Sequence, residues 1–277
     1  MRGNSNLDEN RFANRVQVMG VINTTPDSFF DGGQFSTTEK ALQHALQLIN
    51  DGVDILDVGG ESTRPGSEHV DLEKELERTI PLIKLIREVS NVPISIDTNK
   101  PGVMRQAVEA GATIINSIWA LQLDNSLKVA AELGVPVCFM HMQGTPGTMQ
   151  ENPTYKDVVS EVLDFLKQRI DAAIDAGIDQ NNIIIDPGFG FGKTLQHNLQ
   201  LLKSLDRFKS LEVPLLVGMS RKRMIGTILD KPVDQRLYGS VSSAVIAAML
   251  GADIVRVHDV PETLDAIAMV NALHHFA

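Results

Sequence analysis

Short apolar runs that end in polar or glycine residues occur eight times along this chain of 277 residues. Runs of this length that are rich in Val and Ile are typical of buried parallel strands. With their polar ends they occupy residues 16–23, 54–66, 92–102, 113–117, 135–144, 182–193, 213–226 and 252–260. Helical patterns fill most of the gaps between them. We therefore predict an α/β fold, a single-domain (β/α)₈ TIM barrel.

The runs are spread over nearly the whole chain, which indicates one barrel domain at residues 15–277 behind a flexible polar tail at 1–14. Amphipathic patterns predict helices at 38–51, 71–90, 157–176 and 195–208. Pro81 is expected to kink or divide the second of these helices. Helices predicted at 240–250 and 262–276 are apolar around much of their circumference, which favours a homodimer formed through this C-terminal pair.

Composition excludes several classes of protein. The net charge of −10 argues against a nucleic-acid-binding protein, which needs a basic face. No run of 18 apolar residues is present, so we expect no membrane span, and the polar start lacks the apolar core of a signal peptide. The single cysteine, Cys138, excludes an intrachain disulfide and fits a cytoplasmic protein.

Polar side chains at the ends of the runs are the candidates for chemistry. Asp97 and Asp186 each follow an apolar run, and Asn116 ends the run between them. The active sites of such barrels lie at the carboxyl ends of the strands, so these side chains should converge on one site. Two carboxylates there suit a metal, acid–base catalysis or a ligand with several N–H donors, and an amide suits the edge of a planar heterocycle.

Basic residues follow the last two runs. Lys222 stands in the sequence SRKR, and Arg256 and His258 end the final run. Phosphate sites in these barrels are frequently built after strands 7 and 8, so these residues, with Arg64, are candidates for binding a diphosphate. The sequence PGFGFGKT is one residue short of a P-loop, because Pro187 stands where the first Gly is needed. Its alternating Gly and Phe instead suggest close approach of backbone to a ligand, with Phe189 stacking on an aromatic ring.

Seven motifs in this order resemble the dihydropteroate synthase family. They are NTTPDSFFDGG (23–33), DVGGESTRPG (57–66), SIDTNKP (95–101), MHMQGTPGTMQ (140–150), IDPGFGFGK (185–193), VGMSRK (217–222) and RVHDV (256–260). The resemblance covers roughly residues 16–277. It implies a transferase that joins para-aminobenzoate to a dihydropterin 6-methyl diphosphate, releasing diphosphate and 7,8-dihydropteroate.

The resemblance also implies a role for each matching residue. Asp97, Lys222, Arg256 and His258 would be catalytic. The pterin would bind to Asp97, Asn116, Asp186 and Lys222. The diphosphate would lie near Asn23, Thr63, Arg64, Arg256 and His258, with Asn23 also holding Mg²⁺. The aminobenzoate would meet Pro65, Phe189 and Ser220.

The implied mechanism is dissociative: diphosphate leaves with the help of Mg²⁺, Arg256 and His258, and the amine attacks a pterin methylene cation that Asp97 stabilises. Glycine-bearing segments at 23–37 and 59–71 would close over the site. The chain departs from the usual family pattern at Ser117, Arg223, Thr24 and Phe30, none of which is a proposed catalytic group. Three alternatives stay open: a methyltransferase acting on methyltetrahydrofolate, a class I aldolase that uses Lys222, and a pterin binder without turnover.

Overall fold

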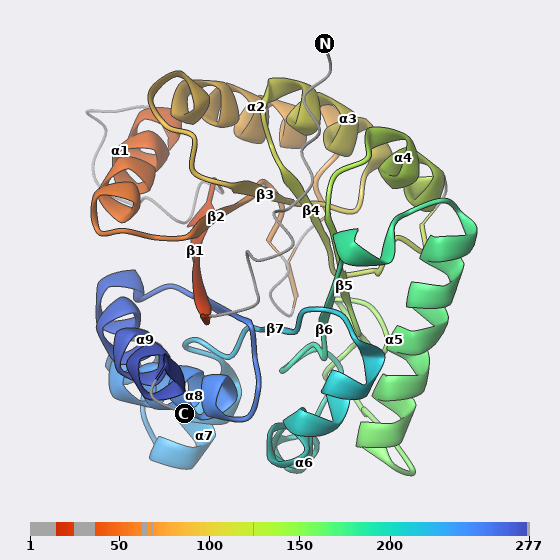
Figure 1. Cartoon of the computed structure of the whole chain (residues 1–277), viewed down its shortest axis with the longest axis vertical. Helices are drawn as coiled ribbons and strands as arrows, with labels where there is room; N and C mark the ends of the chain where they lie inside the picture. Colours follow the sequence, from red (N-terminus) through yellow and green to blue (C-terminus); the bar gives the residue numbers. More distant parts are fainter. Residues whose placement is uncertain (1–14, 25–36, 63–65, 68, 124, 276–277) are drawn as a thin grey trace.

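The computed structural model describes residues 15–24, 37–62, 66–67, 69–123 and 125–275. Eight parallel strands form one sheet in the order β6-β5-β4-β3-β2-β1-β8-β7. They are β1 (Gln17–Asn23), β2 (Ile55–Gly59), β3 (Ile94–Asp97), β4 (Ile114–Ser117), β5 (Val137–Met140), β6 (Ile183–Asp186), β7 (Leu216–Val217) and β8 (Ile254–Val257). A single parallel bridge from Ile185 to Leu215 joins the two edges. The predicted eight-stranded barrel is therefore confirmed, and it is nearly closed (Figure 1).

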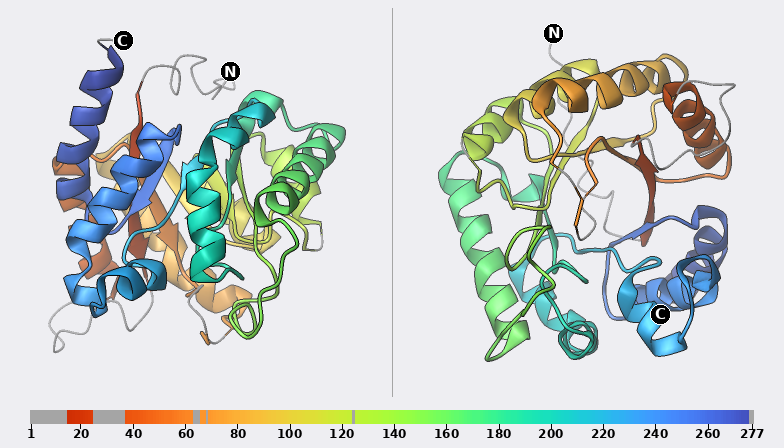
Figure 2. Two further views of the ribbon diagram at one scale, coloured as in Figure 1. Left: turned by 90° about the horizontal axis from the view of Figure 1, so that it is seen from below. Right: turned by 180° about the vertical axis from the view of Figure 1, so that it is seen from behind.

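Helices form a ring outside the strands (Figures 1 and 2). They are α1 (Thr37–Asn50), α2 (Leu72–Val89), α3 (Pro101–Ala110), α4 (Ser126–Leu133), α5 (Val158–Asp175), α6 (Leu195–Lys203), α7 (Arg223–Leu229), α8 (Leu237–Met249) and α9 (Val260–His275). Asp71 and Asp157 cap the N-termini of α2 and α5 by accepting hydrogen bonds from backbone N–H groups of the first turn. These caps explain why the predicted N-terminal ends of both helices agree with the structure.

Pro81 was predicted to kink or divide this helix, and the division is wrong, because α2 runs through Pro81 without interruption. Proline removes the hydrogen bond to the carbonyl four residues earlier, which here belongs to Glu77. Both Pro81 and Glu77 are exposed, so water can satisfy that carbonyl. The buried face of α2, which includes Leu82, Ile83 and Ile86, keeps the helix on the sheet.

The barrel interior is filled in layers. One layer is an apolar cluster contributed by seven of the strands, and its members are Met19, Ile55, Ile114, Cys138, Ile184, Leu216 and Ile254. Side chains alternate along a strand, so the next inward-facing residues lie two positions further along. On β2, β4, β6 and β8 those positions carry polar groups, and β3, which has no residue in the layer, ends at Asp97. The apolar layer therefore forms the floor of a polar mouth at the carboxyl ends of the strands.

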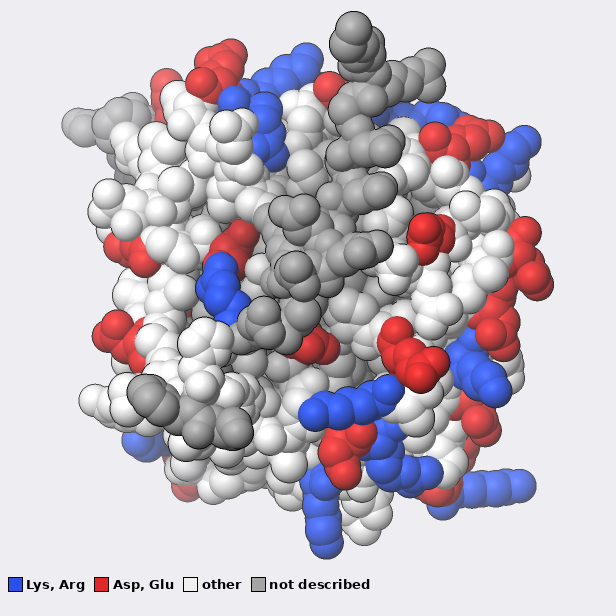
Figure 3. All heavy atoms as spheres, viewed as in Figure 1, with Lys and Arg blue, Asp and Glu red and all other residues white. Residues whose placement is uncertain are grey.

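The surface bears on the predicted partners. Lys and Arg are interspersed with Asp and Glu over the face seen in Figure 3. None of the helices in the described part of the chain is long and apolar enough to cross a bilayer. The predicted tail at 1–14 lies outside the described residues.

Candidate active site

Register brings the predicted pterin residues to one end of the barrel. Asp97 pairs with Gly59 of β2 on one side and with Asn116 of β4 on the other. Asp186 ends β6, level with Met140 of β5. All three side chains follow apolar strand residues and lie directly above the floor, as the sequence predicted.

Arg256 of β8 is the centre of the mouth. Its Nε donates to Asp57 Oδ2 at 2.6 Å, and its Nη2 donates to Asp97 Oδ2 at 3.1 Å. Asp57 is fully buried, and its other oxygen lies 3.5 Å from the amide nitrogen of Asn116. Asp57 was absent from the predicted site, although it stands two positions before Gly59 on the inward face of β2. That alternation was the signal that would have found it.

Charges crowd this half of the mouth. Burial, and then the carboxylate of Asp57, raise the pKa of Asp97 to about 7, although Arg256 opposes the shift. Burial works against the charge of Arg256, but Asp57 and Asp97 raise its pKa, so the guanidinium stays charged. One permanent cation therefore faces two carboxylates, and the pKa of the Asp97 carboxyl lies near neutral pH.

The opposite half of the mouth holds Asp186 and Lys222. The carboxylate of Asp186 accepts a hydrogen bond from the backbone N–H of Gly188 at 2.8 Å. Burial raises the pKa of Asp186, whereas the nearby ammonium of Lys222 lowers it. Burial lowers the pKa of Lys222 to about 8. Lys222 Nζ donates to the carbonyl of Phe189 at 2.6 Å and lies 4.7 Å from the centre of the Phe191 ring.

In the glycine-rich loop, residues 187–192, the structure contradicts the prediction that Phe189 stacks on an aromatic substrate. The Phe189 side chain is 0% exposed and packs in the core between strands and helices, so its ring has no surface for an aromatic substrate. Gly188 and Gly190 have positive φ angles, and this winding turns Phe191 rather than Phe189 toward the mouth. Phe191 packs with Ile118, Met140 and Met149. The sequence predicted a ring at this loop but assigned it to the wrong phenylalanine.

Ser220 and His258 meet on the β7–β8 side. Ser220 Oγ accepts from the backbone N–H of His258 at 3.2 Å and lies 3.1 Å from its Nδ1. The neighbouring Arg221 adopts a left-handed backbone, with φ +57°, and its guanidinium forms an ion pair with Asp259. A Cβ added at Gly218 would lie 3.6 Å from Cβ of Arg256. The turn after β7 is thus fixed against β8, which brings Ser220, Arg256 and His258 to one side of the barrel.

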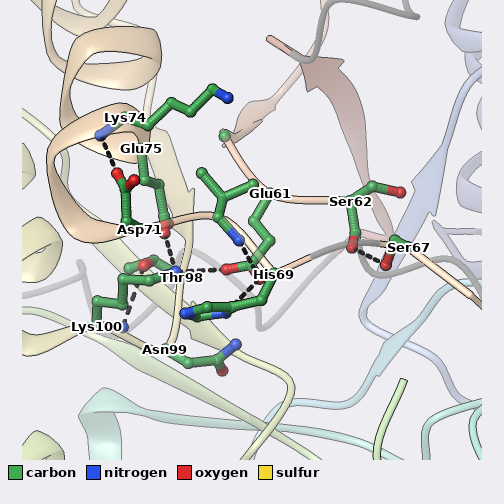
Figure 4. Close-up of polar contacts among 12 residues, drawn as sticks. Glu61, Ser62, Ser67, His69, Asp71, Lys74, Glu75, Thr98, Asn99 and Lys100 are labelled. Carbon is green, nitrogen blue, oxygen red and sulfur yellow. Dashed lines mark hydrogen bonds and ion pairs between the residues drawn. The ribbon is translucent and has the colours of Figure 1, made fainter. Parts of the chain in front are cut away.

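Segment 59–71 is anchored at its base by charged side chains (Figure 4). Lys100 Nζ forms ion pairs with Glu61 of this segment and with Glu75 of α2. Glu61 also accepts from the backbone N–H of Val70 at 3.2 Å, which ties the two ends of the segment together. Burial works against the ammonium of Lys100, but the two carboxylates raise its pKa. The predicted residues Thr63, Arg64 and Pro65 lie outside the described residues.

Asn23, the predicted metal ligand, ends β1 and pairs in register with Gly59, next to Asp97 on β3. Among the described residues, no three His, Cys, Asp or Glu side chains gather to hold a metal ion. Mg²⁺ uses one or two protein oxygens together with substrate phosphates, so it does not require such a cluster. The amide oxygen of Asn23 is a donor of the kind that this ion prefers.

Comparisons with known proteins agree with this geometry. Residues 19–258 match the family model described as pterin binding enzyme. A dihydropteroate synthase of Escherichia coli K12 is 52% identical over 255 residues, which cover 92% of this chain and 90% of the relative.

Two solved structures of the Xanthomonas albilineans dihydropteroate synthase are similar in fold. One, with 4-aminobenzoic acid, has a TM-score of 0.89 at 49% identity and covers 94% of this chain and 93% of the other. The second, in complex with 7,8-dihydropteroate, has a TM-score of 0.86 at 47% identity, covering 94% of both chains. The chain therefore belongs to the dihydropteroate synthase family of pterin-binding enzymes.

Proposed function

We propose that this transferase condenses a dihydropterin 6-methyl diphosphate with para-aminobenzoate to give 7,8-dihydropteroate and diphosphate. The observation that carries the proposal is the shared mouth of Asp97, Asp186, Lys222 and Arg256, in which carboxylates and cations face one space above an apolar floor. The solved relatives with 4-aminobenzoic acid and with 7,8-dihydropteroate support both the second substrate and the product.

The polar groups of the mouth match the hydrogen-bond donors and acceptors of a pterin ring. Its N–H groups match the carboxylate of Asp186, its carbonyl oxygen matches the ammonium of Lys222, and the amide of Asn116 can both donate and accept. Asp186 lies above the apolar layer of the floor and is 6% exposed, so its hydrogen bonds act at low dielectric. This arrangement supports the binding of a flat ring with several N–H donors.

Departure of the diphosphate is assigned to the β8 side. Among the described residues, the hydrogen bonds of the Arg256 guanidinium use Nε and Nη2, which leaves Nη1 for an anion. His258 lies two residues further along the same strand direction and is half-buried. Ser220, held against His258, lies at the edge where the aminobenzoate would enter.

The chemical step that we propose is dissociative. The bond between the methylene carbon and the diphosphate oxygen breaks with both electrons leaving on oxygen. The aromatic amine then attacks the methylene carbon, and its proton goes to solvent. Asp97, when ionised, stabilises the positive charge that spreads into the ring during this step, which is electrostatic catalysis directed at developing charge.

Mg²⁺ belongs to the same proposal, with Asn23 as its protein ligand. Bound there, the ion would neutralise charge on the departing diphosphate. The oxygen donor of Asn23 and its position beside Gly59 and Asp97 support this assignment.

We also propose a homodimer formed through α8 and α9. These helices expose large apolar side chains: Tyr238 at 79%, Ile246 at 46%, Met249 at 50%, Met269 at 73% and Leu273 at 56%. A surface of this kind is typical of a subunit interface. Sedimentation of the purified protein tests it, and a monomer at micromolar concentration would contradict it. A cytoplasmic location is part of the proposal, and the free buried thiol of Cys138 is compatible with it.

The decisive experiment incubates the protein with the dihydropterin diphosphate, para-aminobenzoate and Mg²⁺. We expect release of diphosphate that requires the amine, together with formation of dihydropteroate. Methyl transfer from methyltetrahydrofolate in place of this reaction would favour the methyltransferase alternative. Borohydride trapping of Lys222 with a carbonyl substrate would favour the aldolase alternative. Pterin binding without turnover would indicate the non-catalytic binder.

A further inference from the structure

Lys193 places a buried ammonium beneath the glycine-rich loop. The side chain comes from the residue that directly follows this loop, and it is 3% exposed. Its Nζ donates to the carbonyl of Gly188 at 2.9 Å and to the carbonyl of Phe191 at 3.0 Å, and it lies 2.9 Å from Nδ1 of His141. The carbonyl of His141 lies further away, at 3.4 Å, so the three N–H donors of the ammonium have four acceptors around them.

The loop that Lys193 holds is packed through its backbone. A Cβ on Gly188 would lie 1.8 Å from the carbonyl oxygen of His141, and a Cβ on Gly192 would lie 2.4 Å from that of Gln143. The backbone therefore passes directly against the segment after β5, with no room for side chains. The glycines have no side chain to pack, so the rings of Phe189 and Phe191 and hydrogen bonds to the backbone together fix the loop.

The same loop holds both groups on the Asp186 side of the mouth. The N–H of Gly188 binds the carboxylate of Asp186, and the carbonyl of Phe189 binds the ammonium of Lys222. Lys193 takes the carbonyl of Gly188, so its ammonium and the carboxylate of Asp186 bind to the same residue from two sides. A shift of the loop by a few tenths of an ångström would move both site groups together.

We propose that Lys193 is a positioning residue of the pterin site, which orients Asp186 and Lys222 through the glycine-rich loop and contributes positive charge behind the Asp186 carboxylate. This inference rests on the proposed function, because it assigns the ring-binding side of that site. Lys193 does not contact the substrate and acts only through the loop.

Several charged or titratable groups lie near Asp186 and Lys193 and shift the pKa values of both. Burial raises the pKa of Asp186, and the charges of Lys222, Lys193 and Arg256 lower it. Burial lowers the pKa of Lys193 to about 7. Burial and the charge of Lys193 lower the pKa of His141 to about 2, so His141 is neutral and accepts the hydrogen bond. Other titratable groups of neighbouring elements are Cys138 of β5, Tyr155 before α5 and His197 of α6. The ammonium form of Lys193 therefore favours the ionised carboxylate of Asp186.

The test compares Lys193→Met with the wild type. We expect the Kd of 6-hydroxymethylpterin to rise about tenfold or more at neutral pH, as loss of a charged hydrogen-bond network implies. The KM for the pterin diphosphate should rise in parallel, with a much smaller change in kcat. The pH below which pterin affinity is lost should move upward, because the charge that favours ionised Asp186 is gone.

Three further variants separate the effect of charge from that of structure. Lys193→Arg should restore the wild-type pH dependence at least partly, whereas Lys193→Gln, which keeps N–H donors, should not. Tyr155→Phe removes a different bond to the loop, the one from Tyr155 Oη to the carbonyl of Gly192 at 2.8 Å, without changing a charge near Asp186. It should leave the pH dependence at its wild-type position even where affinity falls.

The outcomes distinguish this inference from the proposed function. A wild-type protein that does not bind the pterin overturns the proposed function itself. A wild type that binds, beside a folded Lys193→Met with the same Kd and the same pH dependence, overturns the role of Lys193 alone. If Lys193→Met does not fold, Lys193→Gln is measured in its place, and an unshifted pH dependence in that variant also overturns the inference.

Discussion

Asp57 of β2 and Arg256 of β8 form a 2.6 Å ion pair across the mouth of the barrel, with strand β1 between their two strands in the sheet. Asp57 is fully buried, and a buried carboxylate of this kind is stable only with a partner. Arg256 binds Asp97 as well, so the position of Asp57 determines where the guanidinium lies relative to Asp97. Asp57 is therefore part of the site, although it presents no surface to a substrate.

Asp57→Asn should change both the pKa of Asp97 and the orientation of Arg256. The substitution removes the negative charge that raises the pKa of Asp97, so this pKa should fall below about 7. It also weakens the bond that orients Arg256, at a cost of about 1.5–3 kcal/mol for a hydrogen bond to a charged group. We expect kcat/KM to fall at least tenfold, with its acid limb displaced to lower pH. An acid limb that stays in place would contradict the coupling between the two carboxylates.

The wild-type pH dependence follows from two groups on opposite sides of the mouth. Asp97 stabilises positive charge only when ionised, so activity should be lost as pH falls through its pKa of about 7. Lys222 donates to the ring as an ammonium, so activity should be lost as pH rises through its pKa of about 8. The profile of kcat/KM, which reports the free enzyme, should be a narrow bell between these values. The range from pH 6 to pH 9 extends about one pH unit beyond each pKa. A flat profile over this range would exclude the roles of Asp97 and Lys222.

Asp186→Ala should abolish detectable pterin binding. It removes the carboxylate that receives the N–H groups of the ring and leaves Lys222 without its counter-charge in a buried site. Sites built on such hydrogen bonds discriminate by about 10⁴ or more. Calorimetry with a diphosphate-free pterin measures the effect, and binding like that of the wild type would refute the assigned role.

Lys100→Met should destabilise the fold as well as segment 59–71. The change leaves Glu75 buried with no cation beside it, and Glu75 Oε1 already has no hydrogen-bond partner among the described residues. Breaking a buried pair from one side costs about 3–5 kcal/mol, and because Lys100 is partly exposed we expect about 2 kcal/mol here.

The control for Lys100 is the double substitution Lys100→Met with Glu75→Gln. It removes the stranded charge and should recover most of the stability, as measured by urea unfolding. Equal destabilisation in the single and double variants would show that the charge of Glu75 is not the cause.

The strands and the main site residues were predictable because they follow from alternation within short runs. Asp97, Asn116 and Asp186 each end such a run, and register then brings them to one edge. Lateral contacts were not predictable in this way. The sequence does not reveal that Arg256 turns inward to Asp57, or that winding at Gly188 buries the ring of Phe189 and leaves Phe191 at the mouth. These outcomes depend on packing between elements that are far apart in sequence.

Gly188→Ala tests the backbone packing of the glycine-rich loop directly. Gly188 has φ +71°, and an added Cβ would lie 1.8 Å from the carbonyl oxygen of His141, a backbone atom that cannot rotate away. Left-handed strain and overpacking each cost about 1–3 kcal/mol, so we expect about 3 kcal/mol or more in stability together with loss of pterin binding. Gly177→Ala is the matched control, because Gly177 has φ +94° but no atom within 4 Å of the added Cβ. It should cost about 1 kcal/mol from strain alone and leave pterin affinity unchanged. If the two variants lose stability equally, the contact with His141 contributes nothing, and the close approach of the loop to the segment after β5 does not exist in solution.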